Sequence, residues 1–202
     1  MNPDFFMLFI PTIAAVSLVP GMCMMLAFTL GMSLGYGRTL WMMAGELMGV
    51  ATVVSASLWL LQKVLMLNPL WFRGLMLAGA VYLFWVAYQL WRTDPVLRET
   101  QSYRGISPQA LLVLGFTTAV MNPKGWAFMF ALLPGFIDAE RPLGGQLALF
   151  LSVITVTEFL SMTLYALAGR WLRQRMESSF GLPLINKLAA VMMVAVSGFV
   201  LF

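Results

Sequence analysis

The sequence contains no histidine and a single cysteine, Cys23, among its 202 residues. These absences exclude a His-based hydrolytic triad, a haem-ligating histidine pair and a dithiol relay within the chain. A phosphate-binding loop and a nucleotide fingerprint are also lacking, so ATP is not the evident energy source. The 17 methionines would suit a soft metal, but we interpret them as apolar filling because the usual metal ligands are missing. We therefore expect a protein that is not an enzyme and that uses no cofactor and no metal site.

Charged residues are scarce, at 10% against about 25% in an average soluble domain, while hydrophobic residues make up 61%. This composition indicates an integral membrane protein whose surface contacts the lipid bilayer. Six apolar runs are long enough, or nearly so, for the ~20 residues of a spanning helix. The first run has no basic segment before it and is too long for a signal peptide, so we expect a retained span. The runs are the uncharged stretch between Asp4 and Arg38, then 39–62, 74–91, 105–137, 142–169 and 188–202.

The distribution of lysine and arginine predicts the orientation of these spans. Seven such residues lie in the connections after spans one, three and five, and three lie in those after spans two and four. Because cytoplasmic loops carry the excess of positive charge, both termini should lie outside, in the periplasm of a Gram-negative cell. The net charge of +4 then reflects topology and anionic lipid headgroups, and no nucleic-acid partner is expected. The counted residues are Arg38, Arg92, Arg98, Arg104, Arg170, Arg173 and Arg175 against Lys63, Arg73 and Arg141.

Two breaks that contain proline lie inside apolar runs, at Val19-Pro20-Gly21 and at Asn122-Pro123-Lys124-Gly125. A break at mid-membrane depth frees backbone groups that lipid cannot satisfy, so such breaks usually line a substrate path. Asn122 is a favoured N-cap and Pro123 suits the first helical position, which predicts a half-helix that begins near the midplane. Pro20 would serve the first run in the same way, and Gly21 permits close approach. The two half-helix N-termini carry partial positive charge and would face one centre that suits a carboxylate.

Three charges lie well inside the spans, namely Glu46, Lys124 and Glu158, and Lys187 lies near the start of the last span. A charge at the bilayer centre costs about 2.5–3.5 kcal/mol on insertion scales, so each should be paired or face a wet cavity. One interpretation is that Lys124 forms a fixed ion pair with Glu46 or Glu158 and only holds helices together. The other is that Lys124 and the half-helix ends bind a substrate carboxylate, while Glu46 or Glu158 binds an amino group or carries a proton in the absence of histidine. The predicted substrate-binding residues are Pro20, Gly21, Asn122, Pro123 and Lys124.

The two halves of the sequence share one pattern. Each has a span interrupted by proline and then a span with one buried acid, which are Pro20 and Glu46 in the first half and Pro123 and Glu158 in the second. Since each half has three spans, the second enters the membrane from the opposite side, which makes an inverted repeat. We expect an all-α integral membrane protein of six transmembrane helices in two inverted three-helix repeats, with helices one and four broken. Residues 1–202 would form a single transmembrane domain, with repeat one at about 1–92, a cytoplasmic loop at about 92–107 and repeat two at about 108–202.

Small residues recur at every fourth position on the first two predicted spans. Ala27, Gly31 and Gly35 do so in the first, and Gly45 and Gly49 in the second. Such faces permit close helix crossings. They predict tight packing within the chain, and a homodimer is the alternative that the sequence leaves open.

Several motifs occur together along nearly the whole chain, and the block Asn122-Pro123-Lys124 at its spacing from Leu133-Pro134-Gly135-Phe136 is the most specific of them. The others are Ser17-Leu18-Val19-Pro20-Gly21, Gly37-Arg38 through Gly45 to Gly49, Gly79-Ala80-Val81-Tyr82-Leu83, Gly115-Phe116 and Asn186. In these motifs the chain resembles the LysE/RhtB family of amino-acid exporters. The resemblance implies a six-span exporter of amino acids or close derivatives from the bacterial cytoplasm, across the inner membrane and in exchange for protons.

The sequence departs from the pattern of that family at two positions. Met22 stands where a second proline is usual, and Gly135 stands where glutamine is common. Both departures bear on the identity of the substrate and not on the fold.

Two other classes of function remain open at this point. One is a channel or a carrier for a solute other than an amino acid, such as a metal ion. The other is a structural or accessory membrane subunit, in which the buried charges only hold a partner.

Overall fold

The computed structural model describes residues 3–67, 105–137 and 142–174, together with scattered positions between 70 and 88. In these parts every regular element is a helix, as the sequence predicts, and no strand occurs. The third predicted span lies largely, and the sixth wholly, outside the described residues. The elements are α1 (Pro3–Leu18), α2 (Met22–Leu34), α3 (Tyr36–Leu67), α5 (Pro108–Val120), α6 (Pro123–Leu132), the short 3₁₀ helix η2 (Leu133–Phe136) and α7 (Leu143–Gln174).

The helices α3 and α7 are long enough to cross a membrane without interruption. Each has 32 residues and extends about 48 Å at 1.5 Å per residue, against a hydrocarbon core of about 30 Å. By length and composition, the described residues hold two candidate spans, or three when α1 and α2 count as one bent span. These helices are those of a membrane protein, and the full set of six spans stays a prediction.

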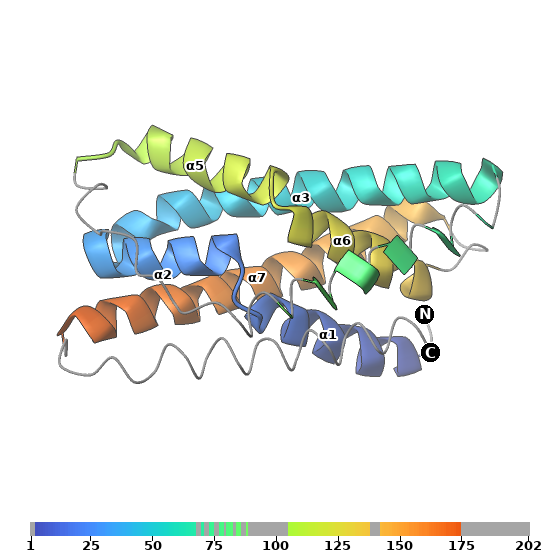
Figure 1. Ribbon diagram of the computed structural model, residues 1–202, viewed down its shortest axis with the longest axis horizontal. Coiled ribbons are helices and arrows are strands. Elements are labelled where there is room, and N and C mark those ends of the chain that lie inside the picture. The colour runs from blue at the N-terminus through green and yellow to red at the C-terminus, as the bar shows by residue number, and fades with distance from the viewer. Residues whose placement is uncertain are drawn as a thin grey trace.

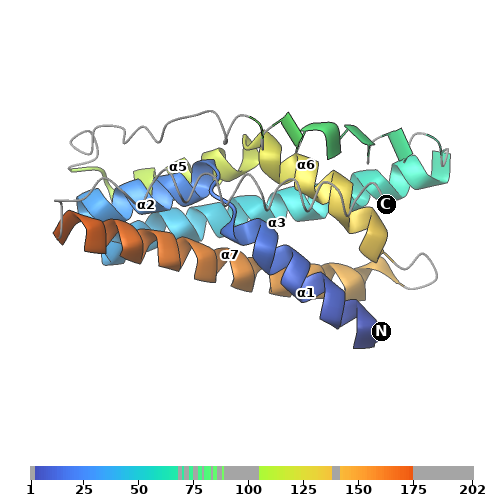
Figure 2. The ribbon, with the colours of Figure 1, turned by 60° about the horizontal axis from the view of Figure 1, so that its bottom comes forward.

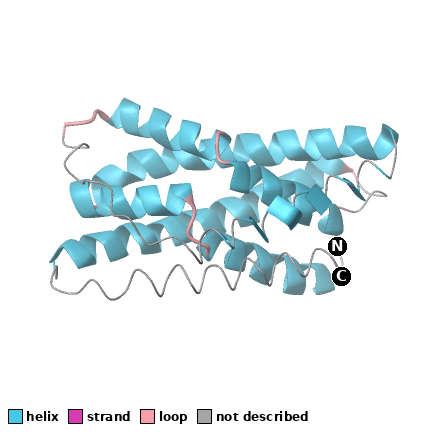
Figure 3. Ribbon diagram, in the orientation of Figure 1, coloured by secondary structure: helices cyan, strands magenta, loops and turns pink. Residues whose placement is uncertain are grey.

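Both predicted helix breaks are present, and Figure 3 shows each as a short loop between helices. At Val19-Pro20-Gly21 the axes of α1 and α2 meet at an angle of 56°. At Met121 and Asn122 the chain leaves α5 and enters α6, with Pro123 as the first helical residue. Since proline has no N–H to donate, it is tolerated at this position and disfavoured further along a helix. The predicted interruptions at Pro20 and Pro123 are therefore both present, and their place in spans one and four stays a prediction.

Side chains supply hydrogen bonds to the backbone carbonyls that the breaks release. The Tyr165 hydroxyl, on α7, donates to the Leu18 carbonyl at 2.9 Å. The Trp126 indole, on α6, donates to the Val120 carbonyl at 2.8 Å. These bonds satisfy acceptors that hydrocarbon could not, which is the condition for a broken helix to exist inside a bilayer.

Each broken helix packs against the long helix of the other half of the sequence. Figures 1 and 2 show α1 and α2 along α7, and α5 and α6 along α3. The long helices α3 and α7 also contact each other. Two inverted repeats would produce this crossed pairing, because each repeat then contributes one broken helix to its partner.

Three chain segments predicted to be cytoplasmic gather at one end of the helices. They are the connection between α2 and α3, the segment before α5 and the C-terminal end of α7 (Figure 1). The Arg38 guanidinium donates to the Ile106 carbonyl and so joins the first two directly. The predicted topology, which puts all three on one side of the membrane, agrees with this arrangement.

Glycines hold two helix pairs at backbone contact near that same end. A Cβ atom added at any of four of them would overlap the backbone of the facing helix. Of the predicted small-residue faces, Gly31 on α2 and Gly45 and Gly49 on α3 therefore pack within the chain, whereas Gly35, the C-cap of α2, has open space around an added Cβ. The homodimer stays a prediction. The contacts are Gly31 on Ala166 and Gly169 on Phe28, between α2 and α7, and Gly45 on Leu112 and Gly115 on Met42, between α3 and α5.

We expect Gly45→Ala to destabilise the protein, because its methyl group would meet the Leu112 carbonyl of a packed helix. The loss should be about 1–3 kcal/mol, as for other overpacked sites. Gly37→Ala is the matched control, since nothing lies within 4 Å of its added Cβ and the site is exposed on the first turn of α3. Thermal unfolding in detergent should show a lower midpoint for Gly45→Ala alone, and equal midpoints would contradict the close packing.

Candidate functional site

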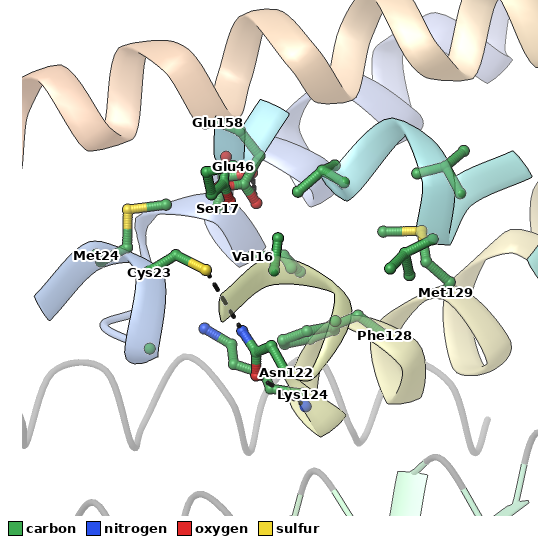
Figure 4. Close-up of a pocket in the computed structure, with 16 residues that line it drawn as sticks. Val16, Ser17, Cys23, Met24, Glu46, Asn122, Lys124, Phe128, Met129 and Glu158 are labelled. Carbon is green, nitrogen blue, oxygen red and sulfur yellow. Dashed lines mark hydrogen bonds between the residues drawn. The ribbon is translucent and has the colours of Figure 1, made fainter. Parts of the chain in front are cut away.

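A cavity of about 60 Å³ lies between the two helix breaks, with walls from α1, α2, α3, α5, α6 and α7. Of the predicted site residues, five line it: Gly21, Glu46, Asn122, Lys124 and Glu158. Figure 4 shows Asn122 and Lys124 on one side of it, with Glu46 and Glu158 together on another. The structure thus brings together residues that lie more than a hundred positions apart in the sequence.

The remaining predicted site residues, Pro20 and Pro123, do not line the cavity. Pro20 is buried in the turn that precedes α2, and Pro123 opens α6. Both act on the course of the backbone, and neither offers a side-chain group to a ligand.

The second break is built as an N-cap. The Asn122 side-chain oxygen accepts from the Lys124 backbone N–H at 3.1 Å, which satisfies one of the free donors at the start of α6. The amide group of the same side chain donates toward the Cys23 sulfur at 3.8 Å. Asn122 therefore caps its own helix and contacts the first turn of α2 across the cavity.

The first break leaves the start of α2 without a side-chain cap. Gly21 is the N-cap residue, no side chain accepts a hydrogen bond there, and the first turn of α2 holds no acid. A Cβ at Gly21 would lie 3.0 Å from the Lys124 ammonium nitrogen. The absence of a side chain at Gly21 gives the Lys124 ammonium room to approach the backbone. The backbone conformation does not itself require glycine, because a φ of −132° is open to any residue.

The Lys124 ammonium lies between the two breaks. It donates to the Val19 carbonyl at 2.8 Å and is 5.4 Å from the centre of the Phe128 ring. Val19 follows the C-terminal end of α1, where the helix dipole is negative and favours a cation. Within the described residues no direct ion pair joins Lys124 to Glu46 or Glu158, although the Glu158 charge acts on it. The structure therefore does not show the fixed ion pair of the first interpretation.

The two carboxyl groups differ in their surroundings. Glu158 accepts a hydrogen bond from the Ser17 hydroxyl at 3.2 Å and is partly exposed to the cavity. Glu46 is only 1% exposed, and its Oε2 has no hydrogen-bond partner. The Glu158 carboxylate and the Cys23 thiol are its neighbours. A buried polar atom without a partner is costly, so the Glu46 carboxyl is open to a proton or to a ligand donor.

This constellation can bind a zwitterion. The ammonium of Lys124 and the uncapped N–H groups of α2 suit an anion, and the two carboxyls suit a cation or a proton. When a bound substrate displaces water from such a site, water no longer screens these charges. Each electrostatic interaction is then stronger than it would be at the protein surface.

Sequence analysis missed Ser17 and Cys23 as members of the site. Ser17 stands three residues before Pro20, and its place in the last turn before a break was a usable signal. The sequence indicated Cys23 only as a single cysteine, too few for a dithiol relay or a metal site, although its position in the first turn of α2 brings it near the other break. Nothing in the sequence singled out Tyr165 as the partner of the first break.

Comparisons with known proteins found one family model and several relatives that match this chain. Residues 14–202 match the family model described as LysE type translocator. The chain is 28% identical to an uncharacterized membrane protein of Vibrio cholerae serotype O1 over 190 residues, which cover 90% of this chain and 93% of that protein. It is 33% identical over 100 residues to the homoserine/homoserine lactone efflux proteins of Salmonella typhi and Salmonella typhimurium, and this match covers 47% of the chain and 46% of each relative. No solved structure matches the chain.

We expect Asn122→Ala to lower the free energy of unfolding by about 0.5–2 kcal/mol, because it removes the cap of α6. Asn122→Ser keeps an oxygen acceptor at the N-cap and should lose less than half as much. Denaturant titration in detergent micelles, followed by tryptophan fluorescence, measures both. Equal losses for the two variants would show that the cap does not hold the second break.

Proposed function

The chain belongs to the LysE type translocator family, and from this membership we propose that it is a secondary transporter that exports amino acids or close derivatives across the bacterial inner membrane in exchange for protons. The observation that carries the proposal is the cavity between two helix breaks, where one ammonium and two carboxyl groups converge. The Salmonella relatives, which are named for the efflux of homoserine and its lactone, support export of a small polar metabolite.

The substrate carboxylate would bind where the N-termini of α2 and α6 approach each other. Gly21 provides backbone access there, and the start of α2 carries N–H groups without a side-chain cap. Lys124 would exchange its bond to the Val19 carbonyl, now 2.8 Å long, for a bond to the substrate anion. The bond to Val19 has one charged partner, whereas a bond to a substrate carboxylate has two, and the added Coulomb attraction favours this exchange.

The substrate ammonium and the coupling proton would share the two carboxyl groups. Glu158 and Glu46 both line the cavity, and Glu46 offers an oxygen without a partner. One carboxyl would bind the ammonium while the other carries the proton inward. With two acids and one base the site carries a formal charge of −1, which a proton neutralises, whereas a zwitterionic substrate adds no net charge.

The proposed architecture is six spans in two inverted repeats, at about 1–92 and 108–202, with both termini in the periplasm. Support comes from the crossed pairing of broken and long helices and from the Arg38 bond to Ile106 at the predicted cytoplasmic end. Alternating access would then expose the cavity to one side of the membrane at a time.

Lys124→Ala should lower the rate of amino-acid efflux roughly 10- to 100-fold, because it removes a charge-assisted bond to the substrate. The amount of protein in the membrane should not change. The measurement is efflux of radiolabelled amino acids from cells that express the variant, with and without a protonophore.

Lys63→Ala is the matched control, since Lys63 is exposed near the C-terminal end of α3 and does not line the cavity. It should export like the parent protein. Normal export by Lys124→Ala would overturn the site assignment.

Substitution of the acids separates the roles of the two carboxyl groups. In proteoliposomes, exchange of labelled for unlabelled substrate needs no net proton movement, whereas net efflux driven by a pH gradient does. Of Glu46→Gln and Glu158→Gln, the one that removes the proton carrier should retain exchange and lose stimulation by the gradient. The other should lose both activities, and stimulation that survives in both variants would contradict coupling through these residues.

A further inference from the structure

Along α3 and α6, the residues that line the cavity change from charged to apolar. On α3, Val50, Val53 and Val54 follow Glu46 at spacings of four, seven and eight residues, which places them on the same face. On α6, Phe128 follows Lys124 by four residues, and Met129 follows next. Along each helix, the side chains that line the cavity therefore change from one charged group to apolar groups within about 6–12 Å.

These apolar residues line one part of the cavity, and we call that part the side-chain chamber. Helices α3 and α6 pack against each other. Helix α6 begins at the second break and α3 passes it, and both continue toward the end that is predicted to be periplasmic (Figure 1). Figure 4 shows Phe128 and Met129 on the side of the cavity away from Cys23 and Met24. Val54 and Phe128 are fully or almost fully buried. The next buried polar side chain on α3, Ser57, does not line the cavity.

From this division we infer that the transported amino acid has a small, uncharged aliphatic side chain, which lies against Val50, Val53, Val54, Phe128 and Met129. The inference rests on the proposed function, because it places the α-carboxylate and α-ammonium at Lys124, Glu46 and Glu158. Those three groups are then engaged, and the chamber offers no further charge for a basic or acidic side chain.

The size of the cavity sets an upper limit on the side chain. A volume of about 60 Å³ holds roughly four to six water molecules. An apolar cavity that admits a benzene ring measures about 150 Å³. Since the same cavity must also hold the α-carboxylate and the α-ammonium, it suits only a small side chain and is too small for an aromatic one.

Hydroxylated side chains of the same shape should be transported less well. The five residues of the side-chain chamber carry no side-chain N–H or O–H donor and no oxygen acceptor, so a hydroxyl that lies against them is left unpaired, which is unfavourable. Apolar pockets discriminate against a hydroxyl by about 10- to 100-fold at most. Because two relatives are named for homoserine, homoserine and its isostere norvaline make the sharpest comparison.

The test measures exchange in proteoliposomes that hold the purified full-length protein, with two isosteric pairs and two charged amino acids as competitors. Norvaline should be preferred to homoserine, and valine to threonine, by about 10-fold, while lysine and aspartate should not compete. Preference for the hydroxylated member of both pairs, or transport of lysine, would overturn the inference and leave the proposed exporter intact. No exchange with any amino acid would instead overturn the proposed function.

A variant of the chamber tests the residues themselves. Val54→Thr keeps the shape of the side chain and adds a hydroxyl to the wall, so the preference for norvaline over homoserine should fall at least threefold. Val156→Thr is the matched control, because Val156 is exposed on α7 and lies outside the cavity. An unchanged preference in Val54→Thr, with exchange still measurable, would show that Val54 does not contact the substrate side chain. If the variant fails to fold, the preference of the parent protein within the two isosteric pairs decides the question.

Discussion

A helix that stops inside a bilayer leaves backbone groups that only other parts of the protein can satisfy. The described residues meet that requirement at two helix breaks, one between α1 and α2 and one between α5 and α6. The carbonyls of the first break accept hydrogen bonds from Tyr165 and Lys124, which belong to the other half of the sequence. The second break is closed by its own Asn122 cap and by Trp126. Because the first break depends on donors from the second half, the two breaks must lie together, and the cavity between them follows.

The same arrangement explains why charged residues tolerate this depth. Lys124 bonds to a carbonyl at the negative end of α1, and Glu158 accepts from Ser17 at the last turn of that helix. Glu46 is the exception, since one of its oxygens has no partner. A site with two acids, one base and one unsatisfied oxygen responds strongly to an added cation. Under the proposed mechanism one of the two acids takes the proton and the other takes the substrate ammonium.

The two helix breaks and the three charges between them were predictable from residue types that are rare in apolar helices. Pro20 and Pro123 marked the breaks, and Glu46, Lys124 and Glu158 stood out as charges in hydrocarbon. The partners were not predictable, because a backbone carbonyl such as that of Val19 has no signature in sequence and competes with carboxylates for the ammonium. The valines of α3 were also invisible, since a span that is apolar all round gives no periodicity to distinguish a cavity wall from a lipid face. Spans three and six lie largely or wholly outside the described residues, so the six-span prediction stands where the sequence left it.

The glycine contacts bear on how such a molecule could move. They bind α2 to α7 and α3 to α5 at backbone distance, which leaves little room for either pair to slide internally. Each pair combines one helix from the first half of the chain with one from the second. The rigid bodies of any rocking motion would therefore be these hybrid pairs, and the boundary between moving parts would cut across the sequence repeats and would not separate them.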